Sequence, residues 1–202
     1  MKALGKGSIA SIVRVGLQIA WVVLWVAAGL LALAAISYGV VLALIASGTI
    51  DPEILRGGDG QIRVGDNGGS FSVEYDSPSG ATWPVIVPAL LIGGVAIGGS
   101  LVIVWRLKKL FDSFSSGEPF RRENAQHLRV IWITMLAIEV SRYLLMGLTA
   151  FLVAQFGSGA REISISIDGD RIAAWGSILI LIVLAEVFRE GARLKEEQEL
   201  TI

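Results

Sequence analysis

Two charged side chains in the middle of an apolar segment are the residues here whose type and spacing could do chemistry. Glu139 and Arg142 lie within the apolar run 128–156, and on a helix their i, i+3 spacing puts them on one face. A charge near the centre of a bilayer is costly, so it persists when it is paired, hydrated or functional. The first interpretation is an ion pair that fixes helix packing, and the alternative is a proton- or ion-coupled site.

Other reactive chemistry is sparse in this chain. There is no cysteine and a single histidine, His127, which excludes disulfides, thiolate nucleophiles and cysteine-based metal sites. A lone histidine also leaves no visible nucleophile–base pair and no His-rich metal site. The glycine-rich stretch 57–60 lacks the lysine of a phosphate-binding loop. We therefore expect no enzyme activity, no cofactor and no bound metal.

Four long apolar runs must position the two charges. The chain of 202 residues is 53% hydrophobic and 17% charged, whereas soluble domains carry roughly a quarter charged residues. Crossing a hydrocarbon core of ~30 Å takes about 20 helical residues. The predicted spans cover residues 17–47, 85–105, 128–156 and 172–188. The sequence thus predicts a mainly α membrane protein, a four-transmembrane-helix bundle that forms a single domain over residues 1–202.

The distribution of basic residues predicts the orientation of these spans. Lysine and arginine gather before the first span, between the second and third, and after the fourth. The positive-inside rule then puts both termini, the hairpin 106–127 and the tail 189–202 in the cytoplasm. The basic residues on that side are Lys2, Lys6, Arg14, Arg106, Lys108, Lys109, Arg121, Arg122, Arg129, Arg189, Arg193 and Lys195.

The two loops on the opposite side have a strand-like pattern. In loop 48–84, residues 61–64 and 70–75 flank a glycine-rich turn, which predicts a hairpin. In loop 157–171, residues 162–167 alternate strictly between polar and apolar side chains. An isolated hairpin is marginal in water, and three strands are more stable. We therefore expect a small extracytoplasmic β-cap that joins the two loops.

Small residues in the second span predict close helix packing. Gly94 and Gly98 have the GxxxG spacing, which lets a neighbouring helix approach closely. That neighbour is a helix of the same chain or of a second copy, and the oligomeric state stays open.

The segment between the second and third spans is the most densely charged. Leu107, Leu110, Phe111 and Phe114 recur at helical spacing, so an amphipathic helix should continue the second span. The tail continues the fourth span as a polar helix. The charges here either set topology and contact lipid head groups, or they form a docking surface for a cytoplasmic protein or an anionic lipid. The candidate partner-binding residues are Lys108, Lys109, Glu118, Pro119, Phe120, Arg121, Arg122, Glu123, Asn124, Arg129, Arg189 and Arg193.

Motifs in this segment and in the tail resemble those of the DUF2975 family of four-span bacterial membrane proteins. They are Phe111-Asp112-Ser113-Phe114, Gly117-Glu118-Pro119-Phe120, Glu123-Asn124-Ala125, Leu128-Arg129, Val187-Phe188-Arg189-Glu190-Gly191 and the closing run 195–202. The resemblance implies a bacterial inner-membrane protein, often encoded beside a small helix-turn-helix regulator. The family has no established catalytic residues, so the resemblance assigns none to this chain.

These features lead to one leading hypothesis and two alternatives. The leading one is a non-enzymatic signalling or regulatory membrane protein that contacts membrane lipid and binds a cytoplasmic partner such as a helix-turn-helix regulator, without touching nucleic acid itself. Deletion of the tail is then expected to release the partner. The first alternative is a small transporter or immunity protein that uses Glu139 and Arg142. The second is an accessory subunit of a larger membrane complex.

Overall fold

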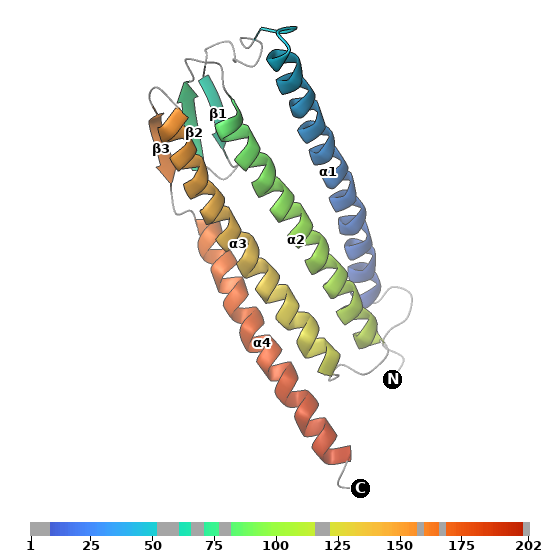
Figure 1. Ribbon diagram of the computed structural model, residues 1–202. Helices are drawn as coiled ribbons and strands as arrows, with labels where there is room; N and C mark the ends of the chain where they lie inside the picture. Colours follow the sequence, from blue (N-terminus) through green and yellow to red (C-terminus); the bar gives the residue numbers. More distant parts are fainter. Residues whose placement is uncertain are drawn as a thin grey trace. The chain divides into compact units, whose positions relative to one another are not determined.

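Four long helices and three short strands make up the described part of the protein in a computed structural model. The described residues are 9–51, 61–65, 71–76, 82–115, 122–156, 160–165 and 169–199. The elements in chain order are α1 (Ile9–Ala46), β1 (Gln61–Gly65), β2 (Phe71–Asp76), α2 (Trp83–Ser115), α3 (Arg122–Phe156), β3 (Ala160–Ile165) and α4 (Gly169–Glu199), as labelled in Figure 1.

All four helices are long and apolar enough to cross a membrane. Their most apolar windows have mean hydropathies of 2.5, 2.3, 1.6 and 2.0 in chain order, and little of these windows is buried inside the protein. Large apolar side chains such as Leu30, Leu144 and Ile180 are 63%, 70% and 69% exposed. Exposed apolar surface on this scale is unfavourable in water and is covered by lipid when the helix spans a bilayer. The four helices therefore indicate a multi-pass membrane protein.

The end of α1 is set by a glycine. Gly48 has a φ of 72°, the left-handed conformation that an L side chain rarely adopts. The Thr49 N–H donates to the Leu44 carbonyl and the Gly48 N–H to the Ile45 carbonyl, each at 3.0 Å. This pair of bonds is the Schellman motif, which satisfies carbonyls that the last helical turn leaves without partners.

The chain divides into two compact units. Unit 1 comprises Met1–Ala27, Ile97–Ile138 and Ala174–Ile202, and unit 2 comprises Ala28–Ala96 and Glu139–Ala173.

In unit 2, polar and aromatic contacts hold the start of α2. Thr82 precedes the helix and is 1% exposed, and its carbonyl accepts the N–H groups of Val85 and Ile86 at 3.2 and 3.1 Å. The Thr82 hydroxyl forms a 2.8 Å hydrogen bond with the Tyr38 hydroxyl of α1. The Trp83 ring meets the Phe156 ring of α3 edge-on, with centroids 5.1 Å apart. These contacts connect α1, α2 and α3 within unit 2.

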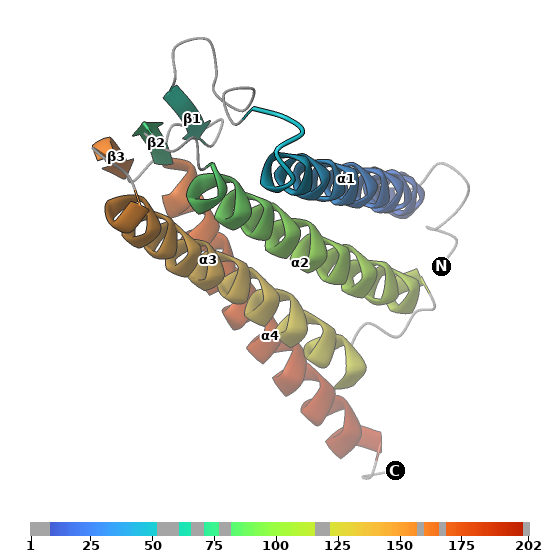
Figure 2. The same ribbon diagram turned by 45° about the horizontal axis from the view of Figure 1, so that its top comes forward.

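Unit 2 also contains a three-stranded antiparallel sheet in the order β1-β2-β3, and Figure 2 shows β2 between the other two strands. Gln61 of β1 lies opposite Asp76 of β2, and Phe71 of β2 lies opposite Ile165 of β3. A register shift near Glu74 interrupts the second pairing, as a β-bulge does. The strands coincide with the alternating segments of the two loops, so pairing of β2 with β3 joins those loops.

The glycines of α2 make close contacts at positions other than the predicted pair. A Cβ added at Gly99 would lie 2.6 Å from Cγ1 of Ile138 and 3.4 Å from Cγ2 of Thr134, both on α3 in unit 1. In unit 2, a Cβ at Gly93 would lie 3.3 Å from Cδ1 of Leu31 on α1. A Cβ added at Gly98 would have no described atom within 4 Å outside its chain neighbours and the backbone of its own helix. The prediction of close helix packing within the chain is therefore wrong at Gly98, and the close contact is made by Gly99 instead.

Candidate functional site: the charged end of unit 1

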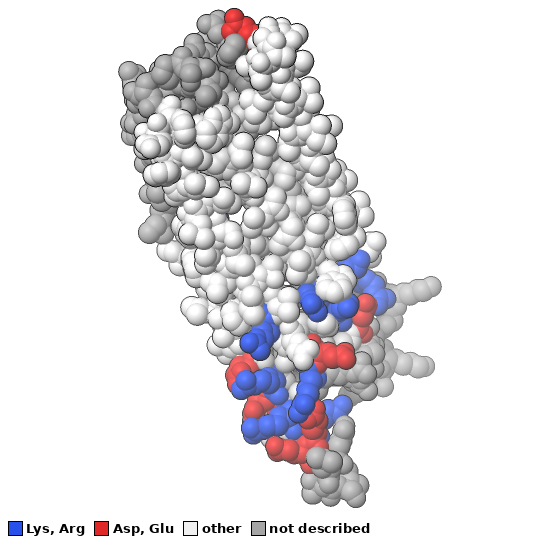
Figure 3. Space-filling model, in the orientation of Figure 1, with Lys and Arg blue, Asp and Glu red and all other residues white. Residues whose placement is uncertain are grey.

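Charged side chains of both signs gather where α2 ends, α3 begins and α4 ends in unit 1. Figure 3 shows these blue and red side chains together. We call this surface, made of residues 106–114, 122–129 and 186–198, the charged end of unit 1. Its position follows from the sequence, because most charged residues of these helices lie at their polar ends rather than in their apolar stretches.

An apolar base holds the three helix ends together. Leu110 of α2, Leu128 of α3 and Ala192 of α4 are 5%, 2% and 1% exposed. The Phe114 ring of α2 stacks on the Phe188 ring of α4, with centroids 5.8 Å apart. The polar continuation of α4 is thus packed against its neighbours.

Asn124 lies inside this base. It is 1% exposed, and its Nδ2 atom donates a 2.9 Å hydrogen bond to the Ser113 hydroxyl of α2. A buried amide that bonds across two helices specifies how they meet. Among the predicted partner-binding residues that the structure describes, Asn124 is the one with a buried side chain.

Cations of α2 surround an aromatic ring and reach α1. The Lys109 ammonium and the Arg106 guanidinium lie 4.1 and 4.6 Å from the centre of the Trp105 ring. Lys108 donates a 2.7 Å hydrogen bond to Oε1 of Gln18. A 2.6 Å ion pair joins Arg14 of α1 to Asp112. Cation–π contacts and exposed ion pairs each contribute modestly, so together they orient this helix end rather than define its stability.

A hollow of about 600 Å³ opens between the end of α2 and the start of α3. Positively and negatively charged side chains line it, together with the single histidine of the chain. Its lining residues are Lys109, Asp112, Ser113, Glu123, Asn124, Gln126 and His127. The Nδ1 atom of His127 lies 3.3 Å from the Nη1 atom of Arg106.

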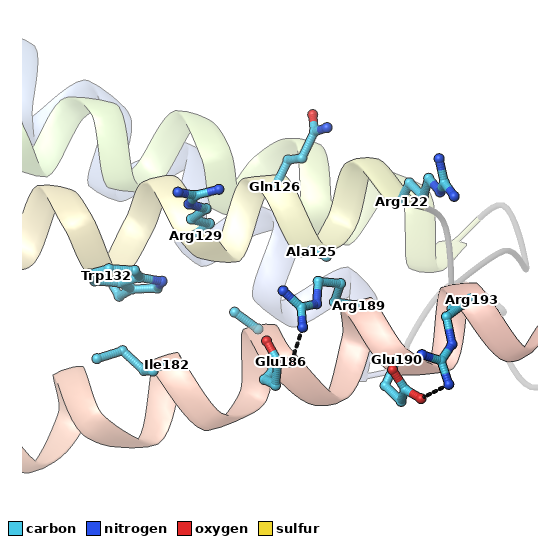
Figure 4. Close-up of a pocket in the computed structure, with 11 residues that line it drawn as sticks. Arg122, Ala125, Gln126, Arg129, Trp132, Ile182, Glu186, Arg189, Glu190 and Arg193 are labelled. Carbon is cyan, nitrogen blue, oxygen red and sulfur yellow. Dashed lines mark hydrogen bonds and ion pairs between the residues drawn. The ribbon is translucent and has the colours of Figure 1, made fainter.

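A second hollow, of about 710 Å³, lies between the start of α3 and the end of α4. We call it the α3–α4 groove. Its lining residues are Arg122, Ala125, Gln126, Arg129, Trp132, Ile182, Ala185, Glu186, Arg189, Glu190 and Arg193. Figure 4 shows Trp132 and Ile182 near each other at one end, and Arg122 and Arg193 at the other. The groove therefore changes from apolar to charged along its length.

Most arginines of the groove have carboxylate partners. Arg189 pairs with Glu186, and Arg193 pairs with Glu190 at 2.5 Å, as the dashed lines in Figure 4 mark. Arg122 pairs with Glu196 at 2.8 Å. Within the part of the chain that the structure describes, Arg129 has no ion-pair or hydrogen-bond partner. Among the described arginines that line this groove, Arg129 is therefore the one without a carboxylate partner.

The structure sorts the predicted partner-binding residues into three groups. Those on the charged end with exposed or half-buried side chains are Lys108, Lys109, Arg122, Glu123, Arg129, Arg189 and Arg193. Asn124 is buried, and Glu118, Pro119, Phe120 and Arg121 lie outside the described residues. The predicted partner-binding residues did not include Trp132, Ile182 and Glu190, which line the α3–α4 groove. The Glu186–Arg189 and Glu190–Arg193 spacings, with a tryptophan near the start of the third span, were the available signal.

Glu139 and Arg142 belong to unit 2. Both side chains are half-buried on α3, and each takes part in an interaction with another group. The Oε2 atom of Glu139 is buried. Pairing of these two residues with each other stays a prediction. Among the described residues, no group of three or more histidines, aspartates and glutamates is placed to hold a metal ion.

Comparison with known proteins assigns the chain to a family. No curated protein and no solved structure matches it. Residues 72–202, however, match the family described as "Protein of unknown function (DUF2975)". The matched region contains α2, α3 and α4, and with them the whole charged end of unit 1. The resemblance drawn from the charged motifs is thereby confirmed, and the chain belongs to the DUF2975 family.

Proposed function

We propose that this DUF2975 protein is a non-enzymatic signalling or regulatory protein of the bacterial inner membrane that binds a cytoplasmic protein at the charged end of unit 1. The observation that carries the proposal is the gathering of exposed charges at this end. Under the positive-inside rule this end faces the cytoplasm. A helix-turn-helix regulator is the partner class that the family resemblance favours.

The hollow between α2 and α3 is the part of the charged end best suited to a protein partner. Lys109, Asp112 and Glu123 offer both signs of charge around it. Complementary charges at an interface guide encounter and exclude wrong partners more than they add affinity. Leu110 and Leu128, on the same two helices, are buried, and this packing holds the helices in place before a partner arrives.

The test is affinity purification of the full-length tagged protein from native membranes in mild detergent, followed by mass spectrometry. We expect a soluble helix-turn-helix protein with the wild type, and its loss with the charge reversals Lys109→Glu and Glu123→Lys. Asp51→Lys is the matched control, because Asp51 is exposed and belongs to unit 2. The proposal would be contradicted if every variant recovered the soluble partner equally well, or if no soluble partner were found with any of them.

These point substitutions are a sharper test than deletion of residues 189–202. Ala192 is buried and Glu196 pairs with Arg122, so the deletion would also disturb packing in unit 1. Loss of a partner could then follow from local unfolding rather than from a lost docking surface.

The two alternative functions have narrower support. A small transporter or immunity protein would rest on Glu139 and Arg142, and burial of the Glu139 Oε2 atom in a candidate span favours it. An accessory subunit would instead rest on helix packing with another membrane protein. The same purification separates these readings: a stoichiometric membrane complex supports the accessory subunit, and a partnerless protein supports the transporter.

The sheet of unit 2 has a place in this proposal as an extracytoplasmic cap. The two loops that supply β1, β2 and β3 carry few basic residues, which favours their translocation across the membrane. Because the sheet joins the loop before α2 to the loop after α3, it would couple the outer ends of the spans.

A further inference from the structure

We propose that the α3–α4 groove binds the head group of an anionic phospholipid, and that Arg129 holds its phosphate. The inference goes beyond the proposed function. The lipid would occupy the α3–α4 groove, whereas the protein partner is proposed to bind the hollow between α2 and α3.

The order of side chains along the groove matches the order of groups in a phospholipid. Trp132 and Ile182 form the apolar end, and tryptophan is enriched where acyl chains meet head groups. Arg129 precedes Trp132 by three residues on α3, which is ~4.5 Å along a helix. If the part of an acyl chain nearest the head group lies beside Trp132, the phosphate of that lipid therefore lies at the level of Arg129.

The charge balance of the groove favours a ligand with negative charge. Glu186 is neutralised by Arg189, and Glu190 by Arg193, while Arg129 has no carboxylate partner among the described residues. Guanidinium presents a planar fork of donors that fits two phosphate oxygens at once. The amide of Gln126, which also lines the groove, supplies a further donor.

Size and surroundings point to a lipid as the source of this phosphate. The hollow of about 710 Å³ lies within the usual range for small-molecule sites, roughly 300–1,000 Å³. Next to its apolar end, Ile133 and Val183 are 42% and 64% exposed on helices long enough to span a membrane. Lipid chains must cover such side chains in a bilayer, so head groups are held near the groove at high local concentration.

The experiment measures lipid binding by native mass spectrometry of the delipidated full-length protein in non-ionic detergent. The probes are phosphatidylglycerol and phosphatidylcholine with the same acyl chains, each with and without inorganic phosphate as competitor. The variants are Arg129→Gln, which removes the charge, and Arg129→Lys, which keeps it. Arg14→Gln is the matched control, because it removes an exposed arginine of unit 1 outside the groove.

We expect the wild type to bind phosphatidylglycerol more tightly than phosphatidylcholine. Arg129→Gln should weaken phosphatidylglycerol binding about tenfold or more, the change that loss of one charge-assisted hydrogen bond produces. Arg129→Lys should retain an intermediate affinity, and Arg14→Gln should bind like the wild type. The Lys109→Glu variant should also bind lipid normally, which separates this test from that of the protein partner.

Three results would overturn the inference. The first is equal binding of the two lipids by the wild type. The second is an unchanged affinity of Arg129→Gln, given that its melting temperature shows it to be folded. The third is displacement of phosphatidylglycerol by inorganic phosphate at equal concentration, which would reassign the groove to a soluble anion.

Discussion

Replacement of Gly99 by alanine tests the closest helix contact in unit 1. The added Cβ would lie 2.6 Å from Cγ1 of Ile138, well inside van der Waals contact, and 3.4 Å from Cγ2 of Thr134. Thr134 is held by a 2.7 Å hydrogen bond from its hydroxyl to the Val130 carbonyl, so its methyl group cannot turn away without losing that bond. Either Ile138 changes rotamer or α2 and α3 move apart.

The size of the effect follows from a matched pair of variants. Overpacking a close contact costs about 1–3 kcal/mol, whereas alanine gains roughly 0.5–1 kcal/mol over glycine inside a helix. Gly98→Ala has the same gain and meets no described atom within 4 Å. The gain in helix propensity is the same for both variants and cancels between them, so Gly99→Ala should be less stable than Gly98→Ala by about 1–3 kcal/mol. At about 2–4 °C per kcal/mol for a chain of this length, the melting temperatures should differ by ~2–12 °C.

Thermal unfolding in detergent, followed by tryptophan fluorescence, measures this difference. The double variant Gly99→Ala/Ile138→Ala completes a cycle, because removal of the Ile138 side chain makes room for the new methyl group. We expect a favourable coupling of about 0.5–3 kcal/mol between the two substitutions. Equal melting temperatures for Gly99→Ala and Gly98→Ala, together with zero coupling, would refute the packing of α2 on α3 at this position.

Two further predictions concern the buried amide and the membrane orientation. Asn124→Ala removes the hydrogen bond to Ser113 and leaves a small cavity, so it should lower the free energy of unfolding by about 1–3 kcal/mol. Gln126→Ala, an exposed change on the same helix, should be nearly neutral in the same melting experiment, and equal effects would argue against a structural role for Asn124. Because the chain has no cysteine, the single variants Asp51→Cys and Glu197→Cys report orientation cleanly. In intact cells a membrane-impermeant maleimide should label Asp51→Cys alone, and labelling of Glu197→Cys before lysis would reverse the proposed topology.

Much of the fold could be predicted because its signals are local. Each apolar run of the sequence corresponds to one long helix, and each alternating segment corresponds to one strand. The membrane assignment likewise needs only length and hydropathy. The charged segment between the second and third spans could be chosen as a candidate site for the same reason, since its charges are adjacent in the chain.

The details of the site could not be predicted, because they depend on how each helix is rotated about its axis. Gly98 and Gly99 are neighbours in the sequence, and only the contact with Ile138 distinguishes them. Asn124 is a polar residue of a type usually found at the surface, yet packing of α2 on α3 buries it against Ser113. In both cases a rotation of one residue, about 100° on a helix, would exchange the inner and outer side chains.

The sequence by itself determined the spans, the alternating strands, the charged segments and the family, since periodicity, composition and motifs are properties of neighbouring residues. Only the tertiary structure decided that α3 and α4 form a groove, that Glu196 of α4 pairs with Arg122 of α3, and that Arg129 has no carboxylate partner among the described residues. The physical reason is that charge balance in a hollow depends on distances between side chains far apart in the chain, and these exist only once the helices are packed.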